Sequence, residues 1–162
     1  MASFRKNFNS KNSIIKVLMD ILKHFDHHGR KQNKEHFTNL IHVALADGII
    51  DQSETEMLQK FGRKLGFTET EVENLINSEK NSVFHPPYDY FKRFEQVYEV
   101  VKIILADGHI ADNELLLARR FAIKSGFSEA EIPFLIEFLI KGINESADEE
   151  ELFESYKKKR KT

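Results

Sequence analysis

The sequence lacks several features whose absence excludes whole classes of chemistry. It contains no Cys, which rules out disulfides, thiol catalysis, thiolate zinc sites and cysteine-ligated iron–sulfur clusters. It contains no Trp but has 14 Phe, so we expect a core built from Phe and aliphatic side chains. The candidate membrane runs, VVKIILA and FLIEFLI, are each interrupted by a charge. No window therefore approaches the roughly 18 uncharged apolar residues of a membrane span.

Basic and acidic residues are nearly balanced in the composition. Lys and Arg total 24 against 26 Asp and Glu, for a net charge of -2, so the whole chain carries no nucleic-acid footprint. The first residues, MASFRKNFNSKNS, are basic but lack the apolar region and cleavage signature of a signal peptide. We therefore expect a soluble, cytoplasmic protein with no integral membrane segment and no nucleic-acid partner.

The chain contains an internal repeat at a shift of sixty positions. The string LADG at 45–48 recurs at 105–108, and the match continues without a gap to Val72 and Ile132. Further matched pairs are Ile50 and Ile110, Glu54 and Glu114, Phe61 and Phe121, Lys64 and Lys124, and Gly66 and Gly126. We interpret the chain as a duplication within a single domain, 1–162. Its parts are a first copy at about 33–78, a linker at 79–87, a second copy at about 88–141 and a C-terminal helix at about 146–160.

Each copy has the apolar periodicity of three helices. Phe37, Leu40, Ile41, Ala44 and Leu45 follow the i, i+3, i+4, i+7, i+8 spacing of one helical stripe, and their partners sixty positions later are all apolar. A further amphipathic helix is predicted at 13–28, and no strand signal competes. The predicted fold class is all-α, a helical bundle of two tandem three-helix repeats plus N- and C-terminal helices.

The predicted helix ends follow known capping rules. Gly66 and Gly126 stand where a helix needs a left-handed residue at its C-terminal end. The strings Thr68-x-x-Glu71 and Ser128-x-x-Glu131 have the pattern of capping boxes, and Ser146-x-x-Glu149 is predicted to cap the last helix.

The repeated Asp-Gly-x-Ile-x-x-x-Glu string matches part of a calcium-binding EF-hand loop, but the loop is incomplete. An EF-hand needs oxygen ligands at its first and third positions. Those positions hold Val43 and Leu45 in the first copy, and Ile103 and Leu105 in the second. Hydrocarbon side chains cannot coordinate a hard cation, so the EF-hand interpretation fails.

Two interpretations of the string remain open. In one it is a helix joint, with Gly48 ending one helix and Asp51-x-x-Glu54 capping the next. In the other it is an acidic site, because Asp47 and Asp107 stand at helix C-termini, where the dipole disfavours an anion by roughly 0.3–1 kcal/mol. If the copies pack with two-fold symmetry, four carboxylates converge, and these would repel unless protonated or bridged by a divalent cation. The residues of this predicted metal site are Asp47, Glu54, Asp107 and Glu114, and the candidate cations are calcium, magnesium and manganese.

These strings resemble the TerB-like tellurite-resistance family. ALADG-x-I-x-x-x-E with LGFT-x-x-E, repeated as ILADG-x-I-x-x-x-E with SGFS-x-x-E, carries the resemblance over about 37–140. The resemblance implies an all-helical fold, no established enzymatic activity, and an association with resistance to tellurite and other stresses. It also implies that the acidic turn residues bind metal. The sequence departs from the family pattern at Ala111, where an acidic or hydroxyl cap is expected.

Other residues suggest a binding role more than a catalytic one. No nucleophile elbow, phosphate-binding Gly loop or Cys–His pair occurs, so we expect no enzyme. Helix 128–141 is apolar nearly all round and needs extra cover, either from the terminal helices or from a protein partner or second copy. His24, His27 and His28 are more typical of a polar helix face than of a zinc site, and the KKKRK tail of a solvated helix end. The alternative function is a protein-interaction scaffold or co-chaperone-type adaptor in which the acidic turns serve only as helix caps.

Overall fold

The computed structural model describes residues 29–46, 50–106 and 108–160. The chain forms two compact units, residues 1–35 and residues 36–162. In the first unit, residues 29–35 are helical, and the helix predicted over 13–28 lies outside the described residues. Everything that follows concerns the second unit.

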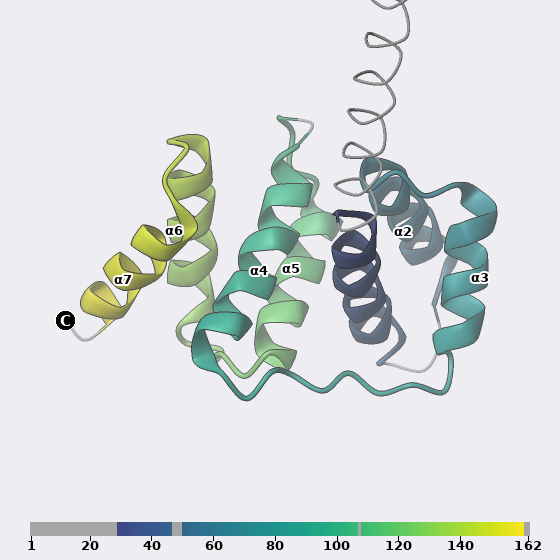
Figure 1. Cartoon of the computed structure of the whole chain (residues 1–162), viewed down its shortest axis with the longest axis horizontal. Helices are drawn as coiled ribbons and strands as arrows, with labels where there is room; N and C mark the ends of the chain where they lie inside the picture. The colour runs from purple at the N-terminus through teal and green to yellow at the C-terminus, as the bar shows by residue number, and fades with distance from the viewer. Residues whose placement is uncertain (1–28, 47–49, 107, 161–162) are drawn as a thin grey trace, which may run out of the picture. The chain divides into compact units, whose positions relative to one another are not determined.

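The second unit is helical throughout its regular structure, and no strand occurs in the part of the chain that the structure describes. The helices are residues 36–45, α2 (Gln52–Lys64), α3 (Glu69–Glu79), α4 (Tyr90–Leu105), α5 (Asp112–Lys124), α6 (Ile132–Asn144) and α7 (Glu149–Arg160) (Figure 1). The prediction of an all-α fold is confirmed. No helix among these residues is long and apolar enough to cross a membrane.

Helix α4 is the central element of the bundle. It contacts α2, α5, α6 and α7, while α2 also contacts α3, and α6 contacts both α5 and α7. In Figure 1, α4 and α5 lie between α2 and α3 on one side and α6 and α7 on the other. Seven apolar or aromatic residues of α4 are buried, which is the all-round burial expected of a helix with neighbours on several sides.

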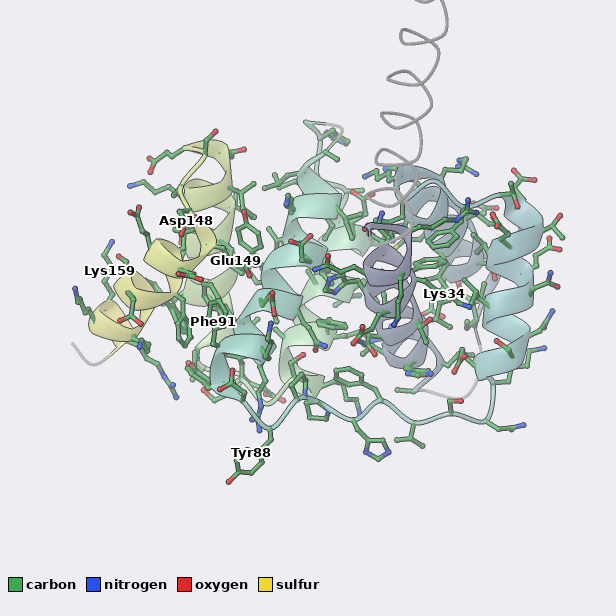
Figure 2. The ribbon with its side chains drawn as sticks, in the orientation of Figure 1. Lys34, Tyr88, Phe91, Asp148, Glu149 and Lys159 are labelled. Carbon is green, nitrogen blue, oxygen red and sulfur yellow. The ribbon has the colours of Figure 1, made fainter. Side chains whose placement is uncertain are left out.

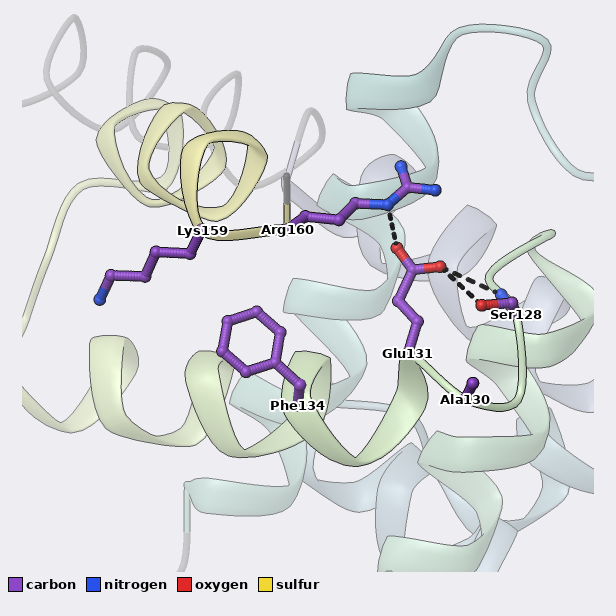
Figure 3. A pocket seen from close by; sticks show the side chains of 6 residues that line it. All are labelled: Ser128, Ala130, Glu131, Phe134, Lys159 and Arg160. Atoms are coloured by element: carbon purple, nitrogen blue, oxygen red, sulfur yellow. Dashed lines mark hydrogen bonds and ion pairs between the residues drawn. The ribbon is translucent and has the colours of Figure 1, made fainter. Parts of the chain in front are cut away.

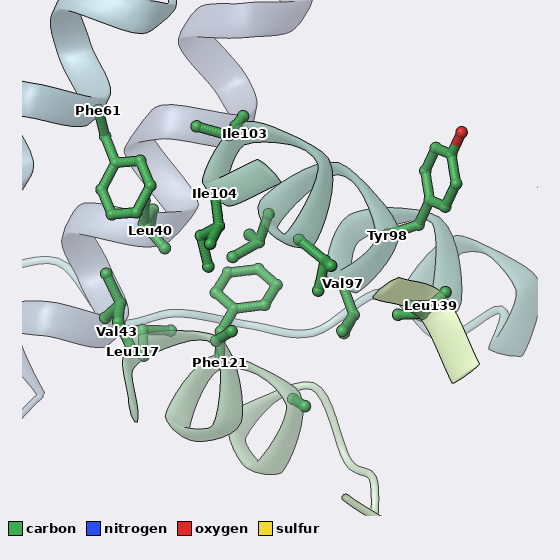
Figure 4. Packing of buried hydrophobic residues seen from close by; sticks show 14 of the residues in the cluster. Leu40, Val43, Phe61, Val97, Tyr98, Ile103, Ile104, Leu117, Phe121 and Leu139 are labelled. Atoms are coloured by element: carbon green, nitrogen blue, oxygen red, sulfur yellow. The ribbon is translucent and has the colours of Figure 1, made fainter. Parts of the chain in front are cut away.

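One continuous apolar core joins the helices of both halves of the sequence. Leu40 and Phe61 come from the first half and Ile104, Leu117 and Phe121 from the second, and all are at most 2% exposed (Figure 4). Full burial of each such side chain contributes about 1.5–3 kcal/mol. The helices are therefore held together mainly by this shared core.

The predicted capping residues occur where the sequence places them for α2 and α3. Asp51 accepts a hydrogen bond from the Glu54 N–H at 2.8 Å, and Glu54 accepts one from the Asp51 N–H at 3.2 Å. Thr68 and Glu71 form the same reciprocal pair at the start of α3. Gly66 and Gly126 have φ of 83° and 95°, the left-handed conformation that Gly adopts without a Cβ penalty.

The start of α6 differs from the predicted helix 128–141. The helix runs from Ile132 to Asn144, with Pro133 in its first turn. The Glu131 carboxylate accepts from the Ser128 N–H at 3.3 Å and from its hydroxyl at 3.0 Å, so one half of the predicted capping box forms, but no side chain caps the start of the helix. Because Pro lacks an N–H and is favoured in a first turn, it sets the beginning of α6 at Ile132, three residues after the position that a cap at Ser128 indicates.

The prediction that Ser146 caps the last helix is wrong. Asp148 accepts from the N–H groups of Glu150 and Glu151 at 3.0 and 3.3 Å, so Asp148 is the N-terminal cap of α7. Ser146 has a φ of 54°, and its N–H bonds the Ile143 carbonyl at 3.0 Å. Ser146 therefore ends α6 in the left-handed position that usually favours Gly.

Residues 80–89, between α3 and α4, contain no helix and run along the bundle. Phe84 packs its ring against Phe121, with the ring centroids 5.4 Å apart. Arg93 Nε donates to the Pro87 carbonyl at 2.6 Å. This segment overlaps the predicted linker, 79–87, and it contacts the rest of the bundle at these two points.

Candidate functional site

The acidic turns are described only in part. Asp47 and Asp107 lie outside the described residues, whereas Glu54 and Glu114 are both described and occupy the third positions of α2 and α5. The geometry of the turns is therefore built from the two glutamates and their neighbours.

Glu54 joins its own helix cap to a basic residue of the second copy. One carboxylate oxygen, Oε2, accepts from the Asp51 N–H at 3.2 Å. The other, Oε1, lies 2.8 Å from Nη1 of Arg120 on α5. Arg120 Nη2 also lies 3.4 Å from the Val43 carbonyl oxygen, near the end of the first-copy helix.

Glu114 makes the corresponding contacts in the opposite direction. Its side chain is 1% exposed, and its Oε1 lies 2.8 Å from the Lys60 Nζ and 3.7 Å from the Lys64 Nζ, both on α2. Its Oε2 accepts from the Ala111 N–H at 3.1 Å. Lys64 Nζ also donates to the Ile103 carbonyl at 3.1 Å.

These contacts form a reciprocal charge exchange between the two copies. We call Glu54, Lys60, Lys64, Glu114 and Arg120 the charge-exchange cluster. The sixty-residue shift places Lys60 on Arg120 and Val43 on Ile103, so each glutamate contacts a base of the other copy. Arg120 and Lys64 also reach the carbonyls of Val43 and Ile103, near helix C-termini, where a positive charge complements the dipole.

The surroundings of Glu114 determine its protonation. Burial would raise the pKa of its carboxyl, but the hydrogen bonds from Lys60 and the Ala111 N–H and the charge of Lys64 outweigh burial, and the pKa is lowered. Glu114 is therefore held as a carboxylate. A buried carboxylate that is both hydrogen-bonded and paired is stable, whereas one deprived of its partners is costly.

Two of the four residues of the predicted cation site, Glu54 and Glu114, are described by the structure. Both oxygens of Glu54 and of Glu114 already have protein partners. Among the described residues, no group of three or more His, Asp or Glu is placed to hold a metal ion. The four-residue site stays a prediction, because Asp47 and Asp107 lie outside that set. The sequence analysis did not identify Lys60 and Arg120 as partners of the two glutamates. Both are basic residues at equivalent positions of the repeat, and this match could have indicated them.

A second candidate site is a hollow of about 380 Å³ at the start of α6 and the end of α7. We call it the α6–α7 hollow, and it is lined by Ser128, Ala130, Glu131, Phe134, Lys159 and Arg160 (Figure 3). It combines two basic side chains from the last turn of α7 with an aromatic ring from α6. These residues come from the predicted apolar helix and from the basic tail.

Glu131 connects α6 to α7 at the floor of the hollow. Its Oε1 accepts from the Tyr156 hydroxyl at 2.5 Å and lies 2.7 Å from Nε of Arg160, while the Ser128 hydroxyl donates to Oε2. Burial would raise the pKa of Glu131, but the hydrogen bonds from Tyr156 and Ser128 and the charge of Arg160 lower it. The carboxylate therefore stays charged and fixes the position of Arg160.

The apolar surface predicted for helix 128–141 is largely covered within the chain. Leu135, Ile136 and Leu139 are buried, and α4, α5 and α7 all contact α6. Phe134 remains 42% exposed, with its ring stacked on Tyr156 at a centroid distance of 6.0 Å. The cover therefore comes from α4, α5 and α7 together, and one aromatic ring stays open beside the hollow.

The predicted histidine positions add no further site. His24, His27 and His28 lie outside the described residues. His85 and His109 are exposed. Among the histidines that the structure describes, His42 forms a hydrogen bond, with its Nε2 2.6 Å from Oε2 of Glu79. That hydrogen bond is the largest cause of the lowered pKa of Glu79.

Comparison with known proteins identifies one family. The family model described as "Tellurite resistance protein TerB" matches residues 1–77. The match covers the first copy and the residues before it, whereas the motif resemblance extends over about 37–140. Neither the curated proteins nor the solved structures gave a match.

Proposed function

Because the chain contains a TerB-like tellurite-resistance domain, we propose that it is a non-enzymatic stress-response module that works by binding a protein partner. The lack of a recognisable nucleophile, phosphate loop or Cys–His pair in the sequence supports a binding role over catalysis. A cytoplasmic location is part of the proposal, and the absence of Cys agrees with it.

The proposal includes the arrangement of the bundle. The two copies are two three-helix repeats that face each other, with α7 added to the second. The charge-exchange cluster supports this arrangement, because Glu54 contacts Arg120 and Glu114 contacts Lys60 at equivalent repeat positions. In this arrangement the acidic turns act as caps and as inter-repeat ion pairs, which leaves the partner-binding role to another surface.

The partner-binding surface is the α6–α7 hollow. The observation that carries this assignment is the exposed ring of Phe134 beside the cations of Lys159 and Arg160. Exposed aromatic rings and arginines are enriched at protein interfaces. Lys159 Nζ lies 5.3 Å from the Phe138 ring centroid, and Arg160 is held by Glu131 and by the Tyr90 hydroxyl at 2.7 Å. The hollow therefore presents a positioned charge next to an apolar contact.

The partner that fits this surface is an acidic segment carrying an aromatic or aliphatic side chain. Its carboxylates would meet the end of α7, where Lys157, Lys158, Lys159 and Arg160 are concentrated. Its apolar side chain would cover Phe134. Charge complementarity of this kind mainly accelerates association and weakens as salt is added.

Fluorescence anisotropy with a labelled synthetic peptide that contains Glu, Asp and Phe tests whether the α6–α7 hollow is the binding surface. We expect it to bind, with Lys159→Glu and Phe134→Ser each weakening binding at least about tenfold, or 1.4 kcal/mol. Lys141→Glu is the matched control, since Lys141 is an exposed base on α6 that does not line the hollow. Equal binding of a Lys and Phe peptide, or equal weakening by the control, would refute the assignment.

A second candidate function is divalent-cation binding at the acidic turns. The repeated Asp-Gly-x-Ile-x-x-x-Glu string favours it. Since the oxygens of Glu54 and Glu114 are already engaged, a cation here must be held mainly by Asp47 and Asp107 or displace the basic side chains. Thermal unfolding of chelator-treated protein with calcium, magnesium or manganese tests this. A cation at a hundred times its Kd should stabilise by about 2.7 kcal/mol, and Asp47→Asn/Asp107→Asn should abolish the effect. No shift with any of the three would exclude it.

A further inference from the structure

One exposed stripe of α5 has no counterpart on α2. Asp112, Leu116, Arg119 and Ile123 follow an i, i+4, i+7, i+11 spacing, so their side chains lie on one face of the helix. All four are exposed, with Leu116 at 57% and Ile123 at 40%. We call these residues the α5 stripe. Its spacing alternates by four and three residues, as in the seam of two paired helices.

The equivalent face of α2 is polar and makes its contacts within the chain. The residues sixty positions earlier are Gln52, Glu56, Gln59 and Arg63. Gln52 donates to Glu56 at 3.1 Å, and both Gln59 and Arg63 reach Glu69 of α3. On α5, neither Asp112 nor Arg119 forms an ion pair with another described residue. The two copies therefore use the same helix face differently, one within the chain and one open.

The charges of the α5 stripe are self-complementary in one orientation. Leu116 lies four residues after Asp112 and three before Arg119. At a rise of 1.5 Å per residue, the two charges lie about 6 and 4.5 Å from Leu116 along the axis. A second α5 running antiparallel, with Leu116 on the two-fold axis, would bring each Asp112 opposite the other chain's Arg119. A parallel pairing would instead oppose like charges.

We propose that the α5 stripe is an isologous dimer interface that pairs with the α5 stripe of a second copy of this chain. In a two-fold interface the same patch serves both partners, and the antiparallel pairing of two stripes places each Asp112 opposite an Arg119. Because one helix face is smaller than the roughly 800 Å² per partner of a standard interface, the dimer should be weak and concentration-dependent. The interface is separate from the α6–α7 hollow, and this inference does not rest on that one.

Sedimentation equilibrium of the full chain from about 10 μM to about 1 mM covers the range expected for such a dimer. Leu116→Glu and Ile123→Arg install the first-copy residues at the same positions, and we expect each to raise the dimer Kd at least about tenfold. Val83→Glu is the matched control, because Val83 is a 70% exposed apolar residue outside the stripe. Thermal unfolding confirms that each variant is folded.

Charge reversal tests the orientation as well as the surface. We expect Asp112→Arg and Arg119→Asp to be monomeric when measured separately. An equimolar mixture of the two should dimerise, because every cross-chain pair then has opposite charges. A monomer at all concentrations, or a dimer that is insensitive to the stripe variants, would overturn the proposal. A mixture that stays monomeric while the unaltered chain dimerises would overturn the charge pairing. The double variant Asp112→Arg/Arg119→Asp tests the orientation, because an antiparallel pair keeps opposite charges in its homodimer but opposes like charges in a heterodimer with the unaltered chain. Preferential formation of that heterodimer would overturn the antiparallel geometry.

Discussion

The buried carboxylate of Glu114 is the most informative single position for measuring what the charge-exchange cluster contributes. Glu114→Gln keeps the size of the side chain and an oxygen that can accept from the Ala111 N–H. It removes the charge that lies 2.8 Å from Lys60 and 3.7 Å from Lys64. The substitution therefore isolates the ion pairs from the helix cap.

The magnitude follows from the burial of each partner. Breaking a fully buried ion pair costs about 3–5 kcal/mol, because one charge is left without compensation. Here Lys60 is 39% exposed and stays partly hydrated, whereas Lys64 is only 11% exposed. We expect a loss of about 2 kcal/mol in the free energy of unfolding, between the surface and buried limits. With a urea m-value of about 2 kcal/mol/M, the midpoint should fall by about 1 M.

Glu54→Gln is the matched control for this measurement. Glu54 has the same cap and the same reciprocal ion pair, but it and Arg120 are 21% and 24% exposed. We expect this variant to lose about 1 kcal/mol or less, since the Glu54 carboxylate is partly exposed and an ion pair with a hydrated carboxylate contributes less than one with a buried carboxylate. Equal losses for the two variants, or a smaller loss for Glu114→Gln, would refute the view that burial makes the second pair the stronger one.

The effect of Glu114→Gln should also depend on pH in one direction. Because the pKa of Glu114 is lowered below its ordinary value of 4.5 in the folded protein, its carboxylate stabilises the fold fully above that pH. The stabilisation declines as the pH falls through the lower folded-state pKa. Urea titrations of both proteins between pH 7 and pH 3 should therefore converge at the acidic end.

Three further predictions concern α5, α6 and α7. Gly142→Ala should destabilise the protein by about 1–3 kcal/mol, because the added Cβ would lie 2.3 Å from Cδ2 of Leu152. Thermal unfolding checks this, and the same substitution should cost less in a Leu152→Ala background only if that contact is the cause. Burial, with Glu95 and Glu99 of α4 beside it, raises the pKa of Glu149 to about 7 (Figure 2). Stability should therefore decline as pH rises from about 4.5 towards 7, and Glu149→Gln should flatten the dependence of Tm on pH, whereas an unchanged slope would contradict the assignment. Ala111→Asp should stabilise the protein by about 0.5–1 kcal/mol, because it supplies at α5 the cap that Asp51 gives α2. The Glu114 N–H already donates to the Asn113 side chain at 2.9 Å. A gain in the free energy of unfolding well above about 1 kcal/mol would show that the Asn113 hydrogen bond contributes little.

The local features of the fold were largely predictable from the sequence. Apolar spacing located the helices, and the positive φ of Gly66 and Gly126 and the caps at Asp51 and Thr68 occur as predicted. These features depend on residues within one or two turns of each other. Short-range rules failed where two signals competed, as at Pro133, which shifts the start of α6, and at Asp148, which caps α7 in place of Ser146.

The tertiary contacts of the site were not predictable in the same way. The sequence indicates that Glu54 and Glu114 are capping residues, but nothing local shows that their second oxygens meet Arg120 and Lys60. Which base reaches which acid depends on how α2 and α5 are brought together by the shared core. The exposure of Leu116 and Ile123 likewise depends on which face of α5 the neighbouring helices leave uncovered.

The charge-exchange cluster makes each half of the chain depend on residues of the other half for its stability. A fragment ending near residue 77, where the family match ends, would retain Glu54, Lys60 and Lys64 but lose Arg120 and Glu114. The same cut would remove Phe121 and the other second-half residues of the core. We therefore expect the shortest segment that folds alone to be longer than the segment that the family model matches.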